Sequence, residues 1–397
     1  MDDPIPFARP FIGREEEEAV LRVLRSGWLT TGKETLEFEK EFAAFLSPPG
    51  EKPSPPLAAL AVNSATSGLH LALEACGIGP GDLVLVPSLT FTSTAEAARY
   101  LGAEVVFVDA APGTFHINAE TLEKALRKLP PGRAKAVIPV HYGGLPCAME
   151  AILSAAAGYG LKVIEDAAHS FPSRLGPGGY AGTLGDAGVF SFYATKTITT
   201  GEGGMVVTRD AAMTERISVM RSHGIDRSVW NRYTDTKASW YYEVAAPGFK
   251  YNIPDILSAL GRVQLARADS LLALRQNIAL QYDRAFGADG HFTLPPTGAG
   301  DARHLYPLRI NPQRLAVSRN GFIEKLQESG IGVSVHFIPL HTMPYYKKRY
   351  SLEDGDFPES MAAYSRTISL PIWPGMTARQ VERVITVVKA LALEYNR

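Results

Sequence analysis

A single lysine, Lys196, lies among small and apolar residues in the segment Gly188–Gly204. An apolar run ending in Ser191 precedes it, and a turn rich in threonine and glycine follows it. An ammonium group is costly in such surroundings, so we expect a depressed pKa and an amine that is nucleophilic toward carbonyl groups. A frequent use of such an amine is a Schiff base with pyridoxal phosphate (PLP). The alternative is a lysine whose ammonium reaches solvent from a loop, and the segment alone does not exclude it.

A phosphate-binding turn is predicted at residues 62–68, after a predicted strand and at the start of a predicted helix. Small residues such as Ala65 let the backbone approach an anion, while the hydroxyl of Thr66 and the free N–H groups of the helix start supply donors. Ser191, at the end of another predicted strand, could donate to the same phosphate. The alternative is that the hydroxyl groups of this turn only cap the helix.

Further groups at predicted strand ends suit an aromatic cofactor ring. Asp166 ends an apolar strand and could keep a pyridinium nitrogen protonated, which makes the ring an electron sink. His169 could orient Asp166 or lie at the ring edge, and the alternative is a turn with a hydrogen-bonded histidine. Phe91, just past a second strand, could cover the ring face or pack in the core. Because these groups and Lys196 follow successive strands in chain order, their combination favours a PLP site.

Short β-rich runs alternate with helical patterns, such as 66–76 and 120–129, through the first half of the chain. Several of these runs are apolar at successive positions, which is typical of strands covered on both faces. The pattern predicts an α/β fold with a doubly wound, mostly parallel sheet. The link between the last two runs is too short for a helical crossover, so we expect an antiparallel strand there. The seven predicted strands are 57–62, 83–87, 104–109, 136–140, 162–165, 189–192 and 205–208.

The pattern changes after Asn252, and we place a domain boundary near residue 255. This predicts a large domain (1–255) and a smaller C-terminal α+β domain (256–397). The smaller domain begins with a long amphipathic helical pattern that is expected to break near Ser270. The helix predicted at 14–26 could pack on either domain. The later predicted elements are a turn region at 295–300, strands at 305–310 and 333–337, and helices at 256–286, 318–329 and 377–395.

The composition is that of an ordinary globular protein, with 46% hydrophobic and 20% charged residues in 397. A formal net charge of −1 gives no field that would recruit nucleic acid or an anionic membrane, so local groups must bind any anionic ligand. The two cysteines, Cys76 and Cys147, suggest neither a disulfide framework nor a metal site. The sequence has no signal-peptide pattern and no membrane-spanning apolar run, so we expect a cytoplasmic protein.

Three motifs occupy the predicted strand ends: Ser-Ala-Thr-Ser-Gly-Leu-His at 64–70, Glu-Asp-Ala-Ala-His at 165–169, and Ser-Phe-Tyr-Ala-Thr-Lys-Thr-Ile-Thr-Thr-Gly-Glu-Gly-Gly at 191–204. They resemble the motifs of the DegT/StrS-type nucleotide-sugar aminotransferases, which are PLP enzymes of the aspartate-aminotransferase fold, or fold type I. The resemblance includes residues 26–32, 247–255, 336–341 and 370–375, and therefore runs nearly end to end. Within the family, the chain is most similar to enzymes that aminate a UDP-linked 4-keto pentose.

The resemblance implies a role for each candidate residue. Lys196 would be the Schiff-base lysine and the acid/base of the proton shift, Asp166 would pair with the pyridine nitrogen, and His169 would lie beside the ring. The enzyme would be a homodimer with shared active sites. The other implied roles are phosphate binding by Ala65, Thr66 and Ser191, stacking on the ring by Phe91, a phosphate contact from the partner subunit by Asn252, and contacts with the sugar nucleotide by Thr31 and His336.

Two positions depart from the family pattern. Ala65 stands where many members have glycine, which we expect to be tolerated unless the backbone there needs a positive φ. Ala194 stands where many members have proline, which we expect to loosen the lysine loop slightly.

The implied reaction moves an amino group from L-glutamate to a keto sugar linked to a nucleotide diphosphate, with C4 as the expected position and C3 as the alternative. A related sugar dehydratase has histidine at the lysine position, so Lys196 argues against that activity. Neither cysteine lies in the polar, flexible loop that a desulfurase needs. A non-catalytic PLP-binding regulator is disfavoured because Lys196, Asp166 and the phosphate turn occur together. The basic segment 345–349 could bind the diphosphate, although a solvated helix face is the favoured interpretation.

Overall fold

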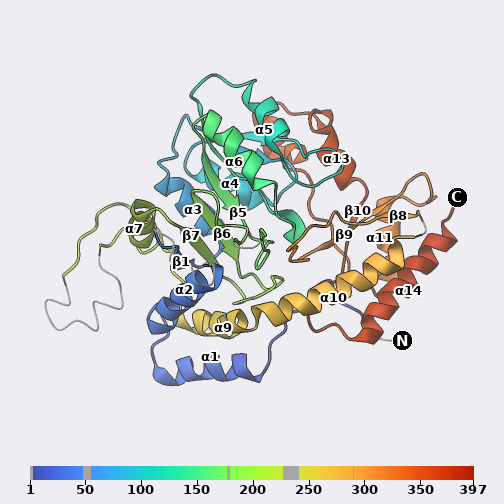
Figure 1. The fold of residues 1–397 in the computed structure, drawn as a ribbon, viewed down its shortest axis with the longest axis horizontal. Helices are drawn as coiled ribbons and strands as arrows, with labels where there is room; N and C mark the ends of the chain where they lie inside the picture. Colours follow the sequence, from blue (N-terminus) through green and yellow to red (C-terminus); the bar gives the residue numbers. More distant parts are fainter. Residues whose placement is uncertain (1–2, 48–54, 177–178, 227–240, 289) are drawn as a thin grey trace.

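A seven-stranded sheet lies at the centre of the computed structural model, which describes residues 3–47, 55–176, 179–226, 241–288 and 290–397 (Figure 1). The strand order is β1-β7-β6-β5-β4-β2-β3, and the pairs from β6 to β3 are parallel. β7 is antiparallel to β6 and to β1. The predicted mostly parallel sheet and its antiparallel strand are thus confirmed. The strands are β1 (Ala58–Val62), β2 (Leu83–Pro87), β3 (Glu104–Val108), β4 (Ala134–Val137), β5 (Lys162–Asp166), β6 (Ala187–Ser191) and β7 (Gly204–Thr208).

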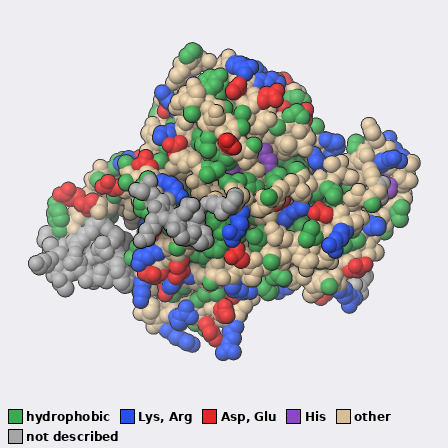
Figure 2. Space-filling view, in the orientation of Figure 1, with side chains coloured by type: hydrophobic (Ala, Val, Ile, Leu, Met, Phe, Trp, Pro, Cys, Tyr) green, Lys and Arg blue, Asp and Glu red, His purple; other side chains and the backbone are tan. Residues whose placement is uncertain are grey.

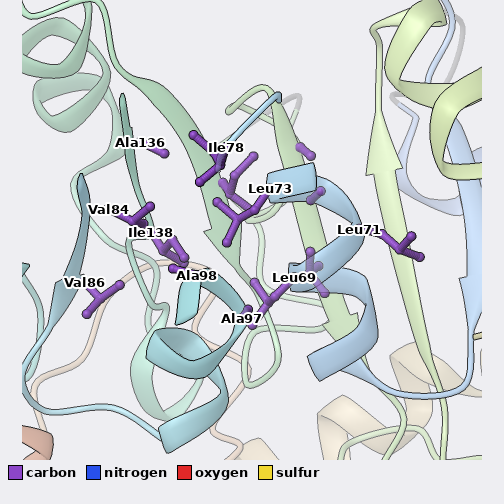
Figure 3. Packing of buried hydrophobic residues seen from close by; sticks show 14 of the residues in the cluster. Leu69, Leu71, Leu73, Ile78, Val84, Val86, Ala97, Ala98, Ala136 and Ile138 are labelled. Carbon is purple, nitrogen blue, oxygen red and sulfur yellow. The ribbon is translucent and has the colours of Figure 1, made fainter. Parts of the chain in front are cut away.

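Helices cover both faces of this sheet, as the apolar runs of its strands predict. On one face lie α3 (Ala65–Ala75), α4 (Thr92–Tyr100) and α7 (Ala211–Met220), and Figure 3 shows Leu69 of α3 pointing toward α4. The other face is covered by α2 (Lys33–Leu46), α5 (Ala119–Leu126) and α6 (Met149–Gly158). A Cβ at position 68 would lie 2.7 Å from Cγ1 of Val189, so glycine there lets α3 approach the strands that border the site.

A smaller sheet of order β10-β9-β8 lies in the C-terminal part of the chain (Figure 1). Its strands are antiparallel, and they share a hydrophobic core with the helices packed beside them, including Tyr282, Phe286 and Phe322. The N-terminal segment also joins this core, because Ile5 donates to the carbonyl of Gly330 at 2.8 Å and accepts from the N–H of Gly332 at 2.7 Å. The elements of this part are β8 (Phe292–Thr293), β9 (Tyr306–Ile310), β10 (Thr367–Leu370), α11 (Arg319–Glu328), α12 (Pro344–Tyr350), α13 (Pro358–Tyr364) and α14 (Ala378–Glu394).

The long helical pattern after residue 255 forms two helices, α9 (Asp255–Ala266) and α10 (Ala268–Phe286), which meet at Arg267, close to the predicted break. α9 packs against α2 and against α1 (Arg14–Ser26), whereas α10 continues toward the smaller sheet (Figure 1). The division into domains at residue 255 stays a prediction. No helix in the described ranges combines the length and the apolar character that a membrane span requires.

The prediction of a strand at 333–337 is wrong. Ser334 pairs with Ser369 of β10 through two backbone hydrogen bonds of 3.2 and 2.8 Å, and the pairing ends there. The following residues leave the sheet, and His336 and Phe337 line the site instead. The apolar and β-branched composition of the segment predicted a strand, but tertiary contacts at the site override that local preference.

Candidate active site

A pocket of about 570 Å³ lies at the carboxyl ends of the strands of the large sheet. Open α/β sheets bind their ligands at this edge because the polar strand ends meet there. Eight of the ten residues predicted for the site line this pocket, whereas Thr31 and Asn252 do not. The eight are Ala65, Thr66, Phe91, Asp166, His169, Ser191, Lys196 and His336.

The phosphate turn forms one wall of the pocket. The Ser64 side chain caps α3 by accepting from the N–H of Ser67 at 3.1 Å. The N–H groups of Ala65 and Thr66 have no acceptor in the described part of the chain, so they are free to bind an anion at the helix N-terminus. Ser191 ends β6 opposite Gly204, where a Cβ would lie 2.8 Å from the nitrogen of Ala65. Glycine at that position keeps the wall open, and this cradle fits a phosphate monoester.

The replacement of glycine by Ala65 causes no backbone strain. Ala65 is the first residue of α3, and the positive φ values of non-glycine residues in the described ranges occur elsewhere, at His223, Arg303 and Ser351. The backbone at Ala65 therefore does not need the positive φ that would disfavour alanine, and tolerance of alanine in phosphate binding stays a prediction.

Asp166 lies at the end of β5 with its side chain only 5% exposed. Its carboxylate accepts from the hydroxyl of Thr94 at 2.8 Å and from the N–H of Ala168 at 3.1 Å. Burial raises the pKa of Asp166, and these two hydrogen bonds oppose the rise. Both bonds hold the carboxylate at the pocket wall, where it can pair with a cationic ring nitrogen. Thr94, rather than His169, orients the carboxylate, so that alternative for His169 is wrong.

Lys196 lines the pocket from the loop between β6 and β7. Two hydrogen bonds keep this loop compact. The N–H of Lys196 donates to the carbonyl of Tyr193 at 2.9 Å, and the hydroxyl of Thr199 donates to the carbonyl of Phe192. Burial lowers the pKa of Lys196 to about 7, with Asp166 opposing the change and Arg275 adding to it. A large fraction of the amine is therefore neutral near pH 7, as nucleophilic attack on an aldehyde requires.

Three histidines form a second wall. His169 lies 4.6 Å from His304 and 6.4 Å from His336, measured between ring centroids. Burial lowers the pKa of all three, that of His336 to about 4, so the rings are neutral at neutral pH. The N–H of Gly143 donates to Nδ1 of His169 at 3.3 Å, which places the ring proton on Nε2. As neutral imidazoles, the three rings offer hydrogen-bonding groups without charge. The described ranges contain no group of three or more His, Cys, Asp or Glu residues that could hold a metal ion.

Phe91 is 56% exposed and lies at the mouth of the pocket, 5.7 Å from Phe337 between ring centroids. The alternative that it packs in the core is therefore wrong. An exposed ring at the edge of a cavity is available to cover a flat ligand.

Three residues in or beside the pocket were not predicted from the sequence: His304, Phe7 and Thr94. His304 precedes β9, and Phe7 stacks on His336 with ring centroids 5.3 Å apart. Both come from segments whose approach to the pocket depends on the smaller sheet. Thr94 follows β2 by seven positions, and its hydroxyl close to a strand end was the available signal.

Thr31 and Asn252 lie together outside the pocket. The Asn252 amide donates to the Thr31 hydroxyl at 2.6 Å, and that hydroxyl donates to the carbonyl of Ile253 at 2.5 Å. Asp255 fixes the adjacent turn by accepting from the N–H groups of Gly32 at 2.7 Å and Thr35 at 3.0 Å. Oδ1 of Asn252 is buried and has no partner in the described structure.

Known proteins are similar to this chain in sequence and in fold. The family model described as the DegT/DnrJ/EryC1/StrS aminotransferase family matches residues 10–389. The spore coat polysaccharide biosynthesis protein SpsC of Bacillus subtilis is 44% identical over 392 residues, which are 97% of this chain and 96% of that protein.

Two solved structures are similar over almost their whole length. PseC of Helicobacter pylori, an aminotransferase involved in pseudoaminic acid biosynthesis, has a TM-score of 0.87 and 29% identity, covering 99% of this chain and 100% of PseC. Spr1654 of Streptococcus pneumoniae in its PLP form has a TM-score of 0.86 and 29% identity, covering 98% of this chain and 99% of Spr1654. The chain therefore belongs to the DegT/DnrJ/EryC1/StrS aminotransferase family and is a PLP-dependent sugar aminotransferase.

Proposed function

We propose that this enzyme transfers the amino group of L-glutamate to a keto sugar linked to a nucleotide diphosphate, at C4 of the sugar. The observation that supports this most is the arrangement of Lys196, Asp166 and the phosphate turn around one pocket. The choice of C4 rests on the resemblance of the sequence to enzymes that aminate a UDP-linked 4-keto pentose. Amination at C3 is the alternative.

The residues of the pocket fit PLP at both of its ends. The free N–H groups of Ala65 and Thr66, with the hydroxyl of Ser191, would bind the phosphate. Asp166 would pair with the ring nitrogen, and Phe91 would cover the ring. PLP, when bound, supplies an aldehyde and an electron sink that stabilises the carbanion formed during amino transfer.

Lys196 would supply the proton chemistry. With a pKa of about 7, about half of its amine is neutral near pH 7, so it can attack the aldehyde, and once free again it can accept a proton. The amine would take the proton from the α-carbon of the donor and return one to the cofactor carbon. With the sugar bound, it would move a proton in the opposite sense. The neutral ring of His169 would lie beside the cofactor ring, and the neutral ring of His336 would hold a sugar hydroxyl group without adding charge.

The active site would be completed in a cytoplasmic homodimer. Among the described residues that line the pocket, Lys196 is the only lysine or arginine, so a nucleotide diphosphate needs cations from elsewhere. On the face shown in Figure 2, acidic and basic side chains are interspersed, which offers no extended basic patch as a substitute. Asn252 would reach the phosphate in the pocket of the partner subunit through its side-chain NH₂ group, and Thr31 would line the sugar-nucleotide site.

The segment 345–349 is a poor candidate for the diphosphate site. Arg349 pairs with Glu104 at 2.5 Å, and Lys347 pairs with Asp354 at 2.9 Å. These ion pairs neutralise much of the charge, which supports the solvated helix face.

Product analysis tests the proposal directly. The PLP-loaded protein is incubated with L-glutamate and, in separate reactions, UDP- or dTDP-linked 4-keto and 3-keto sugars, and the product is examined by NMR. We expect an amino group at C4 of a nucleotide-linked sugar together with one equivalent of 2-oxoglutarate. An amino group at C3 would establish the alternative, and amination of only free sugars would contradict the nucleotide linkage.

A further inference from the structure

Arg275 is a buried cation beside the active site that the proposed mechanism does not use. It lies on α10 and is only 2% exposed. Its guanidinium donates to the carbonyl oxygens of Ile372 at 2.9 Å, His304 at 3.2 Å and Thr195 at 3.3 Å. Nε has no partner, and no carboxylate in the described ranges forms an ion pair with the group. A buried guanidinium without a carboxylate is unusual because its desolvation is costly.

All three acceptor residues line the pocket. Thr195 immediately precedes Lys196 in the lysine loop, which the large sheet positions. His304 precedes β9 and Ile372 follows β10, so both belong to segments that the smaller sheet positions. One side chain therefore ties the lysine loop to the opposite wall of the pocket.

The charge of Arg275 also acts on the amine of Lys196. Burial lowers the pKa of Arg275 to about 10, so it is still charged at neutral pH. Carbonyl dipoles solvate the charge but do not cancel it, and a nearby like charge disfavours the ammonium form of lysine. The other groups facing Lys196 are the carboxylate of Asp166, which acts in the opposite direction, and the carboxylate of Glu202 and the neutral rings of His169, His304 and His336, which also border the pocket.

We propose that Arg275 is a positioning residue for Lys196, which holds the lysine loop against the second wall of the pocket and opposes protonation of the amine. The inference rests on the role proposed above for Lys196. It adds a residue more than 70 positions away in the chain, which contacts the backbone of the loop rather than the substrate.

The test measures the protonation of Lys196 in the full-length protein freed of PLP. Competitive labelling with acetic anhydride across a pH series, followed by peptide mass spectrometry, gives the pH midpoint of the reactivity of Lys196. For Arg275→Gln, which is neutral but can still donate, we expect the midpoint to rise by about one pH unit. Arg275→Met should show the same rise, and either variant suffices if the other is not recovered folded. Arg275→Lys, which keeps the charge, should leave the midpoint near the wild-type value.

Arg309 provides a matched control. It too is buried, donates to the carbonyls of Gly113 and Leu294 at 2.9 and 3.4 Å, and has an unpartnered Nε. Since it does not contact the lysine loop, Arg309→Gln should lower thermal stability but leave the midpoint of Lys196 unchanged.

An unchanged midpoint in folded Arg275→Gln or Arg275→Met would overturn the inference, as would an equal rise in Arg309→Gln. A higher KM for glutamate with an unchanged midpoint would show that Arg275 contacts the donor instead. The proposed function is tested separately: if the midpoint moves as expected but no nucleotide sugar is aminated, the inference on Arg275 stands and the substrate assignment fails.

Discussion

Two polar regions of this molecule differ in how completely the chain supplies hydrogen-bond partners for their buried groups. At the pocket, Asp166 has two donors and Lys196 sits in a closed loop, so the reactive groups are positioned by their own subunit. Around Asn252, the backbone is just as well held by Asp255, but the carbonyl oxygen of the side chain is buried without a partner. The chain thus supplies hydrogen-bond partners for the reactive groups of the pocket, whereas the second region leaves one buried acceptor without a donor in the described ranges.

Lys196→Ala gives the largest effect expected in either region. Loss of the amine removes both the nucleophile and the proton carrier, so turnover should fall by about 10⁴-fold or more. Steady-state assays with glutamate and a keto-sugar nucleotide measure the loss. Lys162→Ala, which removes a surface ion pair with Asp186, is the control and should retain activity. Substantial turnover by Lys196→Ala would show that another residue is the nucleophile and proton carrier.

Asp166→Asn tests the pairing with the ring nitrogen. The amide keeps the shape and can still accept from Thr94, but it lacks the charge that would hold the nitrogen protonated, so kcat should fall by about 1,000-fold. The KM for the sugar should change little. A loss confined to KM would show that Asp166 binds substrate rather than tuning the cofactor.

Asn252→Ala tests the second region. Loss of the proposed phosphate contact from the partner subunit should weaken PLP binding by about tenfold, measured by equilibrium dialysis. At a PLP concentration that leaves Asn252→Ala alone largely without cofactor, mixing it with Lys196→Ala should restore activity. Half of the randomly exchanged dimers then have one intact site, giving about one quarter of the wild-type rate. No recovery, with subunit exchange demonstrated by native mass spectrometry, would contradict a shared site.

Thr94→Val is expected to have the smallest effect. It removes the 2.8 Å hydrogen bond to the carboxylate, so the pKa of Asp166, already raised by burial, rises further. The ionised form is then lost at a higher pH on acidification, and the acid limb of the kcat profile should move upward, with about a fivefold loss of rate on that limb. Thr90 forms a hydrogen bond with Thr94 rather than with Asp166 itself, so Thr90→Val should shift the acid limb less.

The site was predictable from the sequence where it depends on strand ends. Parallel strands end at a common edge, so the residues after β5 and β6 and the turn after β1 had to converge, and Asp166, Ser191 and Thr66 do so. Asn252 and Thr31 were implied by family resemblance alone, because nothing in their local pattern predicts that they lie together.

The second wall of the pocket was not predictable in the same way. His304 lies before β9, and the position of Phe7 depends on the pairing of Ile5 with Ile331. Arg275 contacts the lysine loop from α10, whose sequence shows only an ordinary amphipathic helical pattern. The wrong prediction of a strand at 333–337 has the same cause as these missed residues. The placement of the smaller sheet and its connecting segments beside the pocket, rather than local preference, sets these positions.

The most direct test of the account is to locate the bound cofactor by chemical reduction. The PLP-loaded protein is treated with borohydride and digested, and the modified peptide is identified by mass spectrometry, with and without prior incubation with L-glutamate. We predict a pyridoxyl group on Lys196 that is largely lost after glutamate, because amino transfer releases the lysine. A pyridoxyl group on another lysine would contradict the assignment of Lys196. Labelling of Lys196 that stays at the same level after incubation with glutamate would contradict the proposed amino transfer.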